Sequence, residues 1–202
     1  LAVPLDVGLN LEIAFHTFLL GLFAFCWIAH RGMRTEAVLV GAFLSMFGGT
    51  SFCHVYAGHL SLIDAMAWTP LVFLATDLVI AGAFRSGILM GSAAIALQIL
   101  AGHPQTAYTS AIAALLLLAF SLVRAKRRIR CVLAFSAIIA IGAALAMVQI
   151  AGGIHAGMES TRGMGGLPYA TASAFSLPLE NFVTLVAPKF FGFGVAPGDA
   201  PV

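Results

Sequence analysis

The chain has 202 residues, of which 61% are hydrophobic and only 9% are charged. Soluble domains carry roughly 25% charged residues, so this composition excludes an ordinary water-soluble domain and favours a protein whose surface faces lipid. The net charge of +2 is too small to suggest a partner as highly charged as nucleic acid. We therefore expect membrane lipid, and no nucleic acid, as a partner.

Six apolar segments approach the length of about 20 residues that a helix needs to cross the hydrocarbon layer of a membrane. The fourth and fifth are short, and Pro104 between them favours a tight helical hairpin. The segments also lack the two-residue alternation of a membrane β-barrel. We predict an all-α fold, a polytopic bundle of about six transmembrane helices over residues 7–29, 37–56, 62–84, 86–101, 106–123 and 131–152.

The basic residues predict the direction of these helices, because Lys and Arg are concentrated in the cytoplasmic turns of membrane proteins. If the first helix runs from outside to inside, only Arg162 and Lys189 of the ten basic residues lie outside. We therefore expect a multi-pass protein of the cytoplasmic membrane. The eight basic residues expected in cytoplasmic turns are Arg31, Arg34, Arg85, Arg124, Lys126, Arg127, Arg128 and Arg130.

Some residues inside the predicted helices are expected to serve packing. Gly41, Ser45 and Gly49 recur every four residues, and small residues at this spacing let helices approach closely in lipid. Asp77 lies near the predicted inner face and could neutralise Arg85. Gln98 lies inside the fourth segment, where an amide is expected to hold helices together.

Residues 153–202 are rich in Gly, Ser, Thr and Pro, so we predict an external loop region after a transmembrane domain over residues 1–152. Between Pro178 and Pro188 the chain is too short to span a membrane. Phe182, Leu185 and Val186 fall there at helical spacing, which predicts a short interfacial helix. Because the chain begins without Met and ends in turn-forming residues, we expect both ends to be cuts in a longer chain.

Glu12 and His16 are four residues apart in the outer half of the first predicted helix and therefore share one face. Ionisable residues inside a membrane are costly and usually face the bundle interior or a wet cavity. Two interpretations stay open, a hydrogen-bonded pair that locks helix packing and a pair that lines a cavity. With His59 and His103 of the outer turns, they are expected to approach one external cavity as candidates for substrate binding. Gln105 is a further candidate for substrate binding.

Glu159 and Arg162 lie just outside the sixth predicted helix, among hydroxyl residues and glycines. An arginine side chain matches phosphate with a two-pronged fork, so both residues are candidates for binding a lipid-linked phosphate. The alternative is an ordinary solvated loop in which the two residues pair. A divalent metal is possible as cofactor, but no two histidines have the H-x-x-x-H spacing of a helical metal site, so no ligand set is identifiable.

Several short motifs occur in an order that resembles the bacterial YfhO-like membrane proteins, relatives of the GT-C glycosyltransferases. They are GHLS at 58–61, AWTP at 67–70, AGHPQ at 101–105, ESTR at 159–162, FSLP at 175–178 with EN at 180–181, and APKFFG at 187–192. The resemblance runs through almost all of the chain, and the order and spacing are more specific than any single motif. It implies a multi-span protein of the bacterial inner membrane.

GT-C enzymes take a sugar from a polyprenyl-phosphate carrier on the outer face and pass it to an acceptor. The resemblance therefore implies transfer of a sugar to a cell-envelope acceptor, with a polyprenyl-phosphate-linked sugar as partner. The catalytic acid of these enzymes lies in the first external loop, which would precede Leu1, so we expect the general base to be missing from this chain. A transporter or flippase and a non-catalytic assembly protein remain as alternatives; a transporter would favour broken helices.

Overall fold

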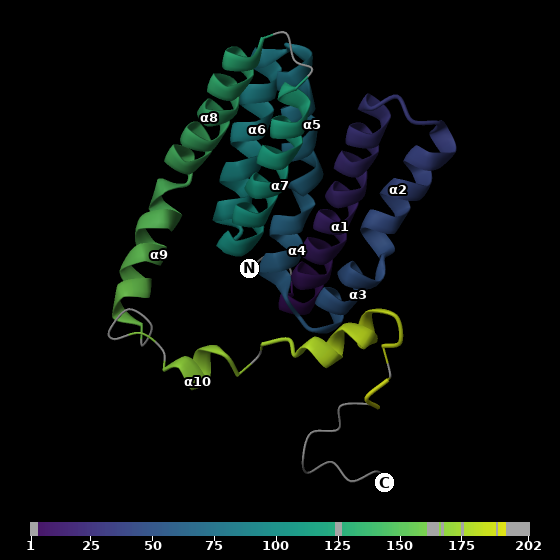
Figure 1. The fold of residues 1–202 in the computed structure, drawn as a ribbon, viewed down its shortest axis with the longest axis vertical. Coiled ribbons are helices and arrows are strands. Elements are labelled where there is room, and N and C mark those ends of the chain that lie inside the picture. The colour runs from purple at the N-terminus through teal and green to yellow at the C-terminus, as the bar shows by residue number, and fades with distance from the viewer. Residues whose placement is uncertain are drawn as a thin grey trace. The chain divides into compact units, whose positions relative to one another are not determined.

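The structure is a computed structural model that describes residues 4–123, 127–160, 166, 168–174, 176–188 and 190–192, and every regular element among them is a helix (Figure 1). The all-α prediction is confirmed for this part of the chain. The chain divides into two compact units, residues 1–154 and 155–202, and each is described by itself.

In the described part of the first unit nine helices begin, and the last of them continues into the second unit. They are α1 (Leu5–His30), α2 (Thr35–Phe47), α3 (Gly49–Tyr56), α4 (Leu60–Ala67), α5 (Thr69–Ala81), α6 (Phe84–Leu100), α7 (Pro104–Leu122), α8 (Arg128–Leu145) and α9 (Met147–Glu159).

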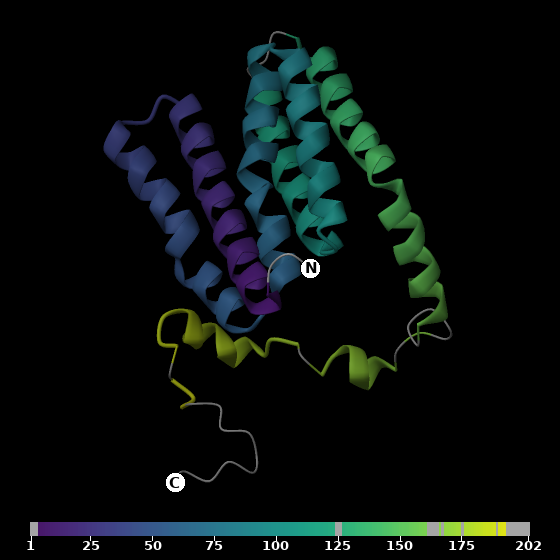
Figure 2. The same cartoon turned by 180° about the vertical axis from the view of Figure 1, so that it is seen from behind.

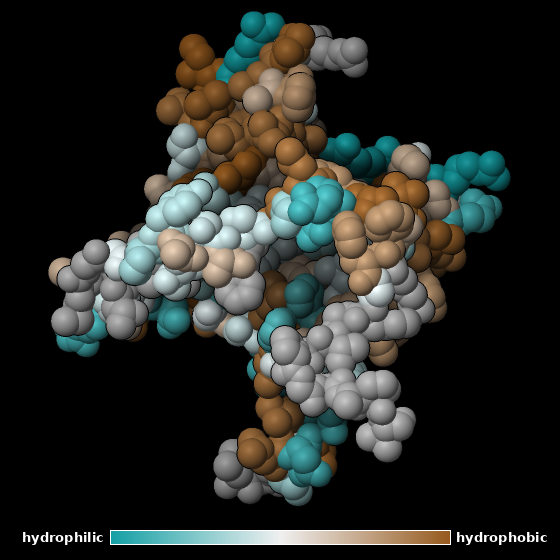
Figure 3. Space-filling view, turned by 60° about the horizontal axis from the view of Figure 1, so that its bottom comes forward, coloured by the Kyte–Doolittle hydropathy of each residue, from teal (hydrophilic) through white to brown (hydrophobic). Residues whose placement is uncertain are grey.

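Among the described residues, five helical stretches are long and apolar enough to cross a membrane, namely Leu5–His30, Thr35–Tyr56, Leu60–Ala81, Pro104–Leu122 and Arg128–Leu145. Large hydrophobic side chains stay on their outside; Leu39, Phe43 and Phe47 of α2, for example, are each more than half exposed. Figure 3 shows broad hydrophobic areas on the molecular surface. Contiguous apolar surface of this extent is unfavourable in water and ordinary in lipid. The chain is a multi-pass membrane protein.

Three of the predicted helices are interrupted. The second breaks at Gly48, whose backbone is extended (φ −64°, ψ 158°), and the third breaks at Trp68, just before Pro70 in the first turn of α5. Proline is tolerated there because the first amides of a helix have no intrahelical acceptor. The sixth breaks at Ala146, between α8 and α9. The third predicted helix, over residues 62–84, ends early, at Ala81 of α5. Gly82 adopts a left-handed conformation (φ 92°) that terminates it.

The main core lies between α5, α6, α7 and α8, where α6 packs closely against α5 and α8 (Figure 2). Glycines allow this approach: a Cβ atom at Gly91 of α6 would lie 2.8–3.0 Å from the Ile138 side chain of α8. A Cβ atom at Gly142 of α8 would lie 2.8 Å from Ile95 of α6. The fully or nearly fully buried residues of this core are Val72, Val79, Ala94, Ile95, Ala114, Leu118, Cys131, Ala134, Phe135 and Ile138.

The buried amide of Gln98 joins α6 to three neighbouring helices. Its Nε2 atom lies within hydrogen-bond distance of the Ala65 carbonyl of α4 (3.1 Å), Thr69 Oγ1 of α5 (2.9 Å) and Ser110 Oγ of α7 (3.1 Å), and these three acceptors share its two hydrogens. Gln98 therefore holds helices together, as the sequence indicates.

The small-residue stripe of the second predicted helix packs through only one of its glycines. A Cβ atom at Gly41 would overlap the Ile28 side chain of α1, so Gly41 is where the two backbones come close. Ser45 Oγ donates to the Gly41 carbonyl at 2.8 Å. Gly49 follows the break at Gly48, and a Cβ atom there would meet nothing within 4 Å.

The connecting turns alternate between two ends of the bundle (Figures 1 and 2). The α1–α2 and α5–α6 turns and the start of α8 lie at one end, which we call the basic end. The turns at residues 57–59 and 101–103 lie at the opposite end. The basic end holds the described basic residues Arg31, Arg34, Arg85, Arg127, Arg128 and Arg130, while Arg124 and Lys126 lie outside the described residues.

This arrangement predicts how the two ends are labelled in intact cells. In a background without Cys26, Cys53 and Cys131, we expect His103→Cys to react with a membrane-impermeant maleimide and Arg34→Cys to react only after lysis, because basic turns stay cytoplasmic. The measurement is gel-shift labelling before and after permeabilisation. The opposite labelling pattern would reverse the orientation of the bundle.

The sequence suggested that Asp77 neutralises Arg85. In the structure Asp77 pairs with Arg31 at the basic end. Arg31 donates from Nε to Asp77 Oδ2 (2.8 Å) and from Nη2 to Oδ1 (2.9 Å), and Trp27 Nε1 also donates to Oδ2 (2.8 Å). The Arg31 guanidinium additionally lies 5.3 Å from the Trp27 ring centre. This network connects the end of α1 to α5.

The second unit contains α10 (Tyr169–Ala172) and a 3₁₀ helix, η1 (Leu179–Leu185). The short helix predicted between Pro178 and Pro188 is therefore present, with 3₁₀ rather than α geometry. Its apolar side chains Leu179, Phe182 and Leu185 are exposed. Its position at a membrane surface stays a prediction.

Candidate functional site

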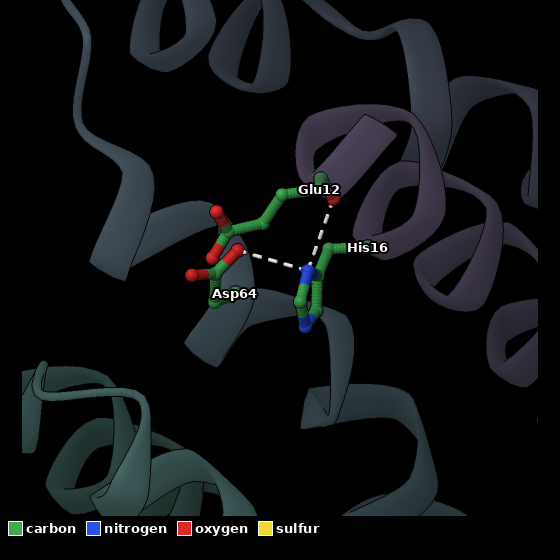
Figure 4. A group of neighbouring side chains, drawn as sticks. All are labelled: Glu12, His16 and Asp64. Carbon is green, nitrogen blue, oxygen red and sulfur yellow. Dashed lines mark hydrogen bonds and ion pairs between the residues drawn. The ribbon is translucent and has the colours of Figure 1, made fainter. Parts of the chain in front are cut away.

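Three ionisable side chains meet near the end of the bundle opposite the basic end (Figure 4). Glu12 and His16 belong to α1, and Asp64 belongs to α4. His16 Nδ1 lies 3.0 Å from Asp64 Oδ1 and 3.1 Å from the Glu12 carbonyl oxygen. In the tautomer that carries its proton on Nδ1, the ring can donate to both of these oxygen atoms. The Glu12 carboxylate extends past the ring to the Asp64 carboxylate, as Figure 4 shows.

The packing of α1 against α4 positions these side chains. The buried Leu19 and Leu20 of α1 contact Ala67 of α4, with Phe23 and Trp68 packed around them. His16 lies about one turn and Glu12 about two turns before this contact on α1, so the face that carries them continues toward α4. The apolar contact therefore brings the i, i+4 pair of one helix to the single acid of the other.

The cluster carries more negative than positive charge. The side chains of His16 and Asp64 are 18% and 14% exposed, while Glu12 is exposed. None of the ion pairs in the described part of the chain joins Glu12 or Asp64 to Lys or Arg. Two carboxylates in a low-dielectric region repel each other unless they share a proton or a cation. The cluster therefore favours taking up a proton or binding a positive ion.

The cluster could serve as an acid–base group or as a cation site. One ligand atom from each of Glu12, His16 and Asp64 lies within 4.8 Å of the other two, which is a donor set suited to a divalent cation. The sequence alone identified no such set. A cation held by the two carboxylates would leave His16 as the hydrogen-bond partner that orients Asp64.

His59 and His103 meet at a different place at the same end. They line a pocket of about 480 Å³ with Gly58, Leu60, Ser61 and Leu62. His59 Nδ1 also lies 3.3 Å from His54 Nδ1. Glu12 and His16 are not among the residues that line this pocket. The structure thus brings together the two candidate histidines of the outer turns, while Glu12 and His16 point to Asp64.

Gln105, the remaining candidate of the first unit, joins neither group. Gln105 is exposed in the first turn of α7, where its carbonyl accepts from Thr109 Oγ1 at 3.0 Å. Glu159 belongs to the second unit, and its carboxylate lies 3.3 Å from His155 Nε2 in an exposed pair. Arg162 lies outside the described residues, so its predicted contact with phosphate stays a prediction.

Asp64 is the residue that sequence reasoning left out of the candidate site. A signal for it existed, because Asp64 is the single acid in the outer half of its predicted helix and lies at the depth of Glu12 and His16. The missing information was that α1 contacts α4, two helices that are not consecutive in the chain.

Comparison of the chain with models of known protein families, with curated proteins and with solved structures finds no match.

Proposed function

We propose that this chain forms membrane-embedded machinery of a GT-C-type glycosyltransferase, which moves a sugar from a polyprenyl-phosphate carrier to a cell-envelope acceptor at the bacterial inner membrane. The observation that carries the proposal is the cluster of Glu12, His16 and Asp64 opposite the basic end. If the basic end faces the cytoplasm, the cluster lies at the outer face. The motifs that resemble YfhO-like proteins supply the reaction class.

The cluster would supply the general base that sugar transfer requires. The Asp64 carboxylate, oriented by His16, or the Glu12 carboxylate beside it would accept the proton of the acceptor hydroxyl. The hydroxyl oxygen then forms a bond to the anomeric carbon of the sugar. The bond from that carbon to the carrier's phosphate oxygen breaks, and polyprenyl phosphate leaves with the electron pair. This assignment places the base within the chain, in contrast to the expectation that it precedes Leu1.

The proposal includes a sixth membrane-spanning helix. Helix α6 is an apolar helix of 17 residues, which correspond to roughly 25 Å at 1.5 Å per residue. Its two ends lie at opposite ends of the bundle, and a bilayer can thin slightly around a short helix. Arg162 stays in the proposal as the residue that would hold the carrier's phosphate.

Loss of the base should abolish transfer without loss of the protein. In the full-length protein, we expect Asp64→Asn and Glu12→Gln to lower sugar transfer, with the stronger variant at least about 100-fold down, the usual contribution of a general base. The measurement is mass spectrometry of envelope glycans in a strain that carries only the variant. Glu36→Gln is the matched control, because Glu36 is an exposed acid at the basic end. Normal transfer in both cluster variants, at normal protein levels, would place the base elsewhere.

A transporter is the second candidate, favoured by the helix interruptions at Gly48 and Trp68. Transporters use broken helices to expose backbone groups to a substrate, and Gly48 and Thr69, at these two breaks, line one cleft. In that case Glu12, His16 and Asp64 would bind a coupling proton. Proteoliposomes separate the two functions, since a transporter moves its substrate across the membrane without forming a glycosidic bond.

A further inference from the structure

A cleft of about 650 Å³ lies between α1, α2, α3, α4, α5 and α7 of the first unit. Its walls are largely apolar and include Leu20, Trp27 and Phe73, and none of the described residues that line it is charged. The cluster of Glu12, His16 and Asp64 does not contribute to it. Seven hydroxyl groups do line it, from Ser45, Thr50, Ser51, Thr69, Thr106, Thr109 and Ser110.

Three of these hydroxyl groups have already used their hydrogen on a backbone carbonyl. Ser45 Oγ donates to Gly41 O (2.8 Å), Ser51 Oγ donates to Ser45 O (2.9 Å), and Thr109 Oγ1 donates to Gln105 O (3.0 Å). A hydroxyl group has one hydrogen and two lone pairs. These three groups therefore present only lone pairs and act toward a ligand as acceptors.

Two further hydroxyl groups are held in place by the buried Gln98, which does not itself line the cleft. Its Nε2 atom donates to both Thr69 Oγ1 and Ser110 Oγ, which lie 3.1 Å from each other. The contact between the two hydroxyl groups uses one of their two hydrogens, so one is left to donate.

We propose that this cleft binds an uncharged amphiphile whose head group carries several hydroxyl groups, as a neutral glycolipid does. The head-group hydroxyls would donate to the lone pairs of Ser45, Ser51 and Thr109, and the alkyl chain would pack against the apolar walls. A phosphate group would find no cation among the described residues of the cleft, and neutral hydroxyl donors would not compensate the desolvation of its charge. The proposal does not depend on the transferase function, because it rests on a different set of residues.

Photo-crosslinking of the full-length protein in lipid nanodiscs tests the proposal. The probes are an alkyl glucoside and an alkyl phosphate that carry the same diazirine in the same alkyl chain. We expect the glucoside to label peptides of α1, α2, α3 and α7 that line the cleft, at least tenfold more than the phosphate does. Excess unlabelled alkyl glucoside should suppress this labelling.

Single hydroxyl deletions then test the contacts. We expect Ser51→Ala and Ser110→Ala each to raise the half-saturating glucoside concentration roughly three- to tenfold, the range for one lost hydrogen bond. Ser136→Ala on α8 is the matched control, because Ser136 is exposed and does not line the cleft. Equal labelling by both probes would overturn the proposal, as would unchanged labelling in the Ser51→Ala/Ser110→Ala double variant. Absence of cleft labelling would also overturn it, since another segment or a lipid chain would then fill the cleft.

Discussion

Replacing Asp77 with alanine is expected to lower the midpoint of thermal unfolding by roughly 5–10 °C, which corresponds to about 2–3 kcal/mol for a chain of this size. The change removes the shared acceptor of Arg31 and Trp27, so three charge-assisted hydrogen bonds between α1 and α5 are lost together. The Asp77 side chain is only 13% exposed, so water replaces these bonds poorly. The measurement is retention of monodisperse protein in detergent after heating.

A double-mutant cycle separates this ion pair from the general effect of losing a charge. Arg31→Ala and Asp77→Ala should combine less than additively, because either change alone breaks the same contact. Glu36→Ala is the matched control, since its contact with Arg34 is exposed on both sides and such pairs contribute little. Additive effects in the double variant would mean that the ion pair of Arg31 and Asp77 does not couple α1 to α5.

The sequence predicted the helices well because a single physical requirement sets their length. A helix that crosses hydrocarbon must be apolar over about 20 residues, and the predicted and observed segments agree within a few residues at most ends. The interruptions were harder to predict. Gly48 stands beside Gly49, which the sequence assigned to a small-residue packing stripe, and no break was predicted there. Pro70 in the first turn of a helix marks a possible start as well as a kink. Ala146 has neither a glycine nor a proline beside it, and we have no account of that break from local sequence.

The candidate site was predicted in part, for a different reason. The shared face of Glu12 and His16 follows from helical periodicity alone, and both side chains do lie on the face that meets α4. Their partner Asp64 and the hydroxyl groups around the cleft depend on which helices touch. Hydropathy carries no information about contacts between non-consecutive helices, because all membrane helices are similarly apolar whichever neighbours they contact. The pairing of Asp77 with Arg31 was missed for the same reason. Arg85 is close to Asp77 in the sequence, whereas Arg31 is close to it in the folded structure.

Changes in side-chain size where α6 packs against α8 should also have a large effect on the stability of the bundle. Gly91→Val is expected to destabilise the bundle by about 1–3 kcal/mol, because a Cβ atom at Gly91 would already lie 2.8–3.0 Å from Cδ1, Cγ2 and Cγ1 of Ile138. Ile138→Ala should cost about 2–5 kcal/mol by itself, since Ile138 is 1% exposed and its loss leaves a cavity. Both values are read from thermal unfolding in detergent.

The double variant Gly91→Val/Ile138→Ala tests whether contact with Ile138 causes the destabilisation by Gly91→Val. The three atoms nearest to a Cβ atom at Gly91 all belong to the Ile138 side chain. Shortening that side chain therefore makes room for valine, and valine refills the cavity. We expect the double variant to be more stable than the sum of the single effects predicts, by about 1–3 kcal/mol. Gly152→Val in α9 should be near neutral, because a Cβ atom there meets nothing within 4 Å and valine is no worse than glycine inside a helix. Strict additivity in the α6–α8 pair would show that Gly91 is required for backbone flexibility rather than for the close approach of the two helices.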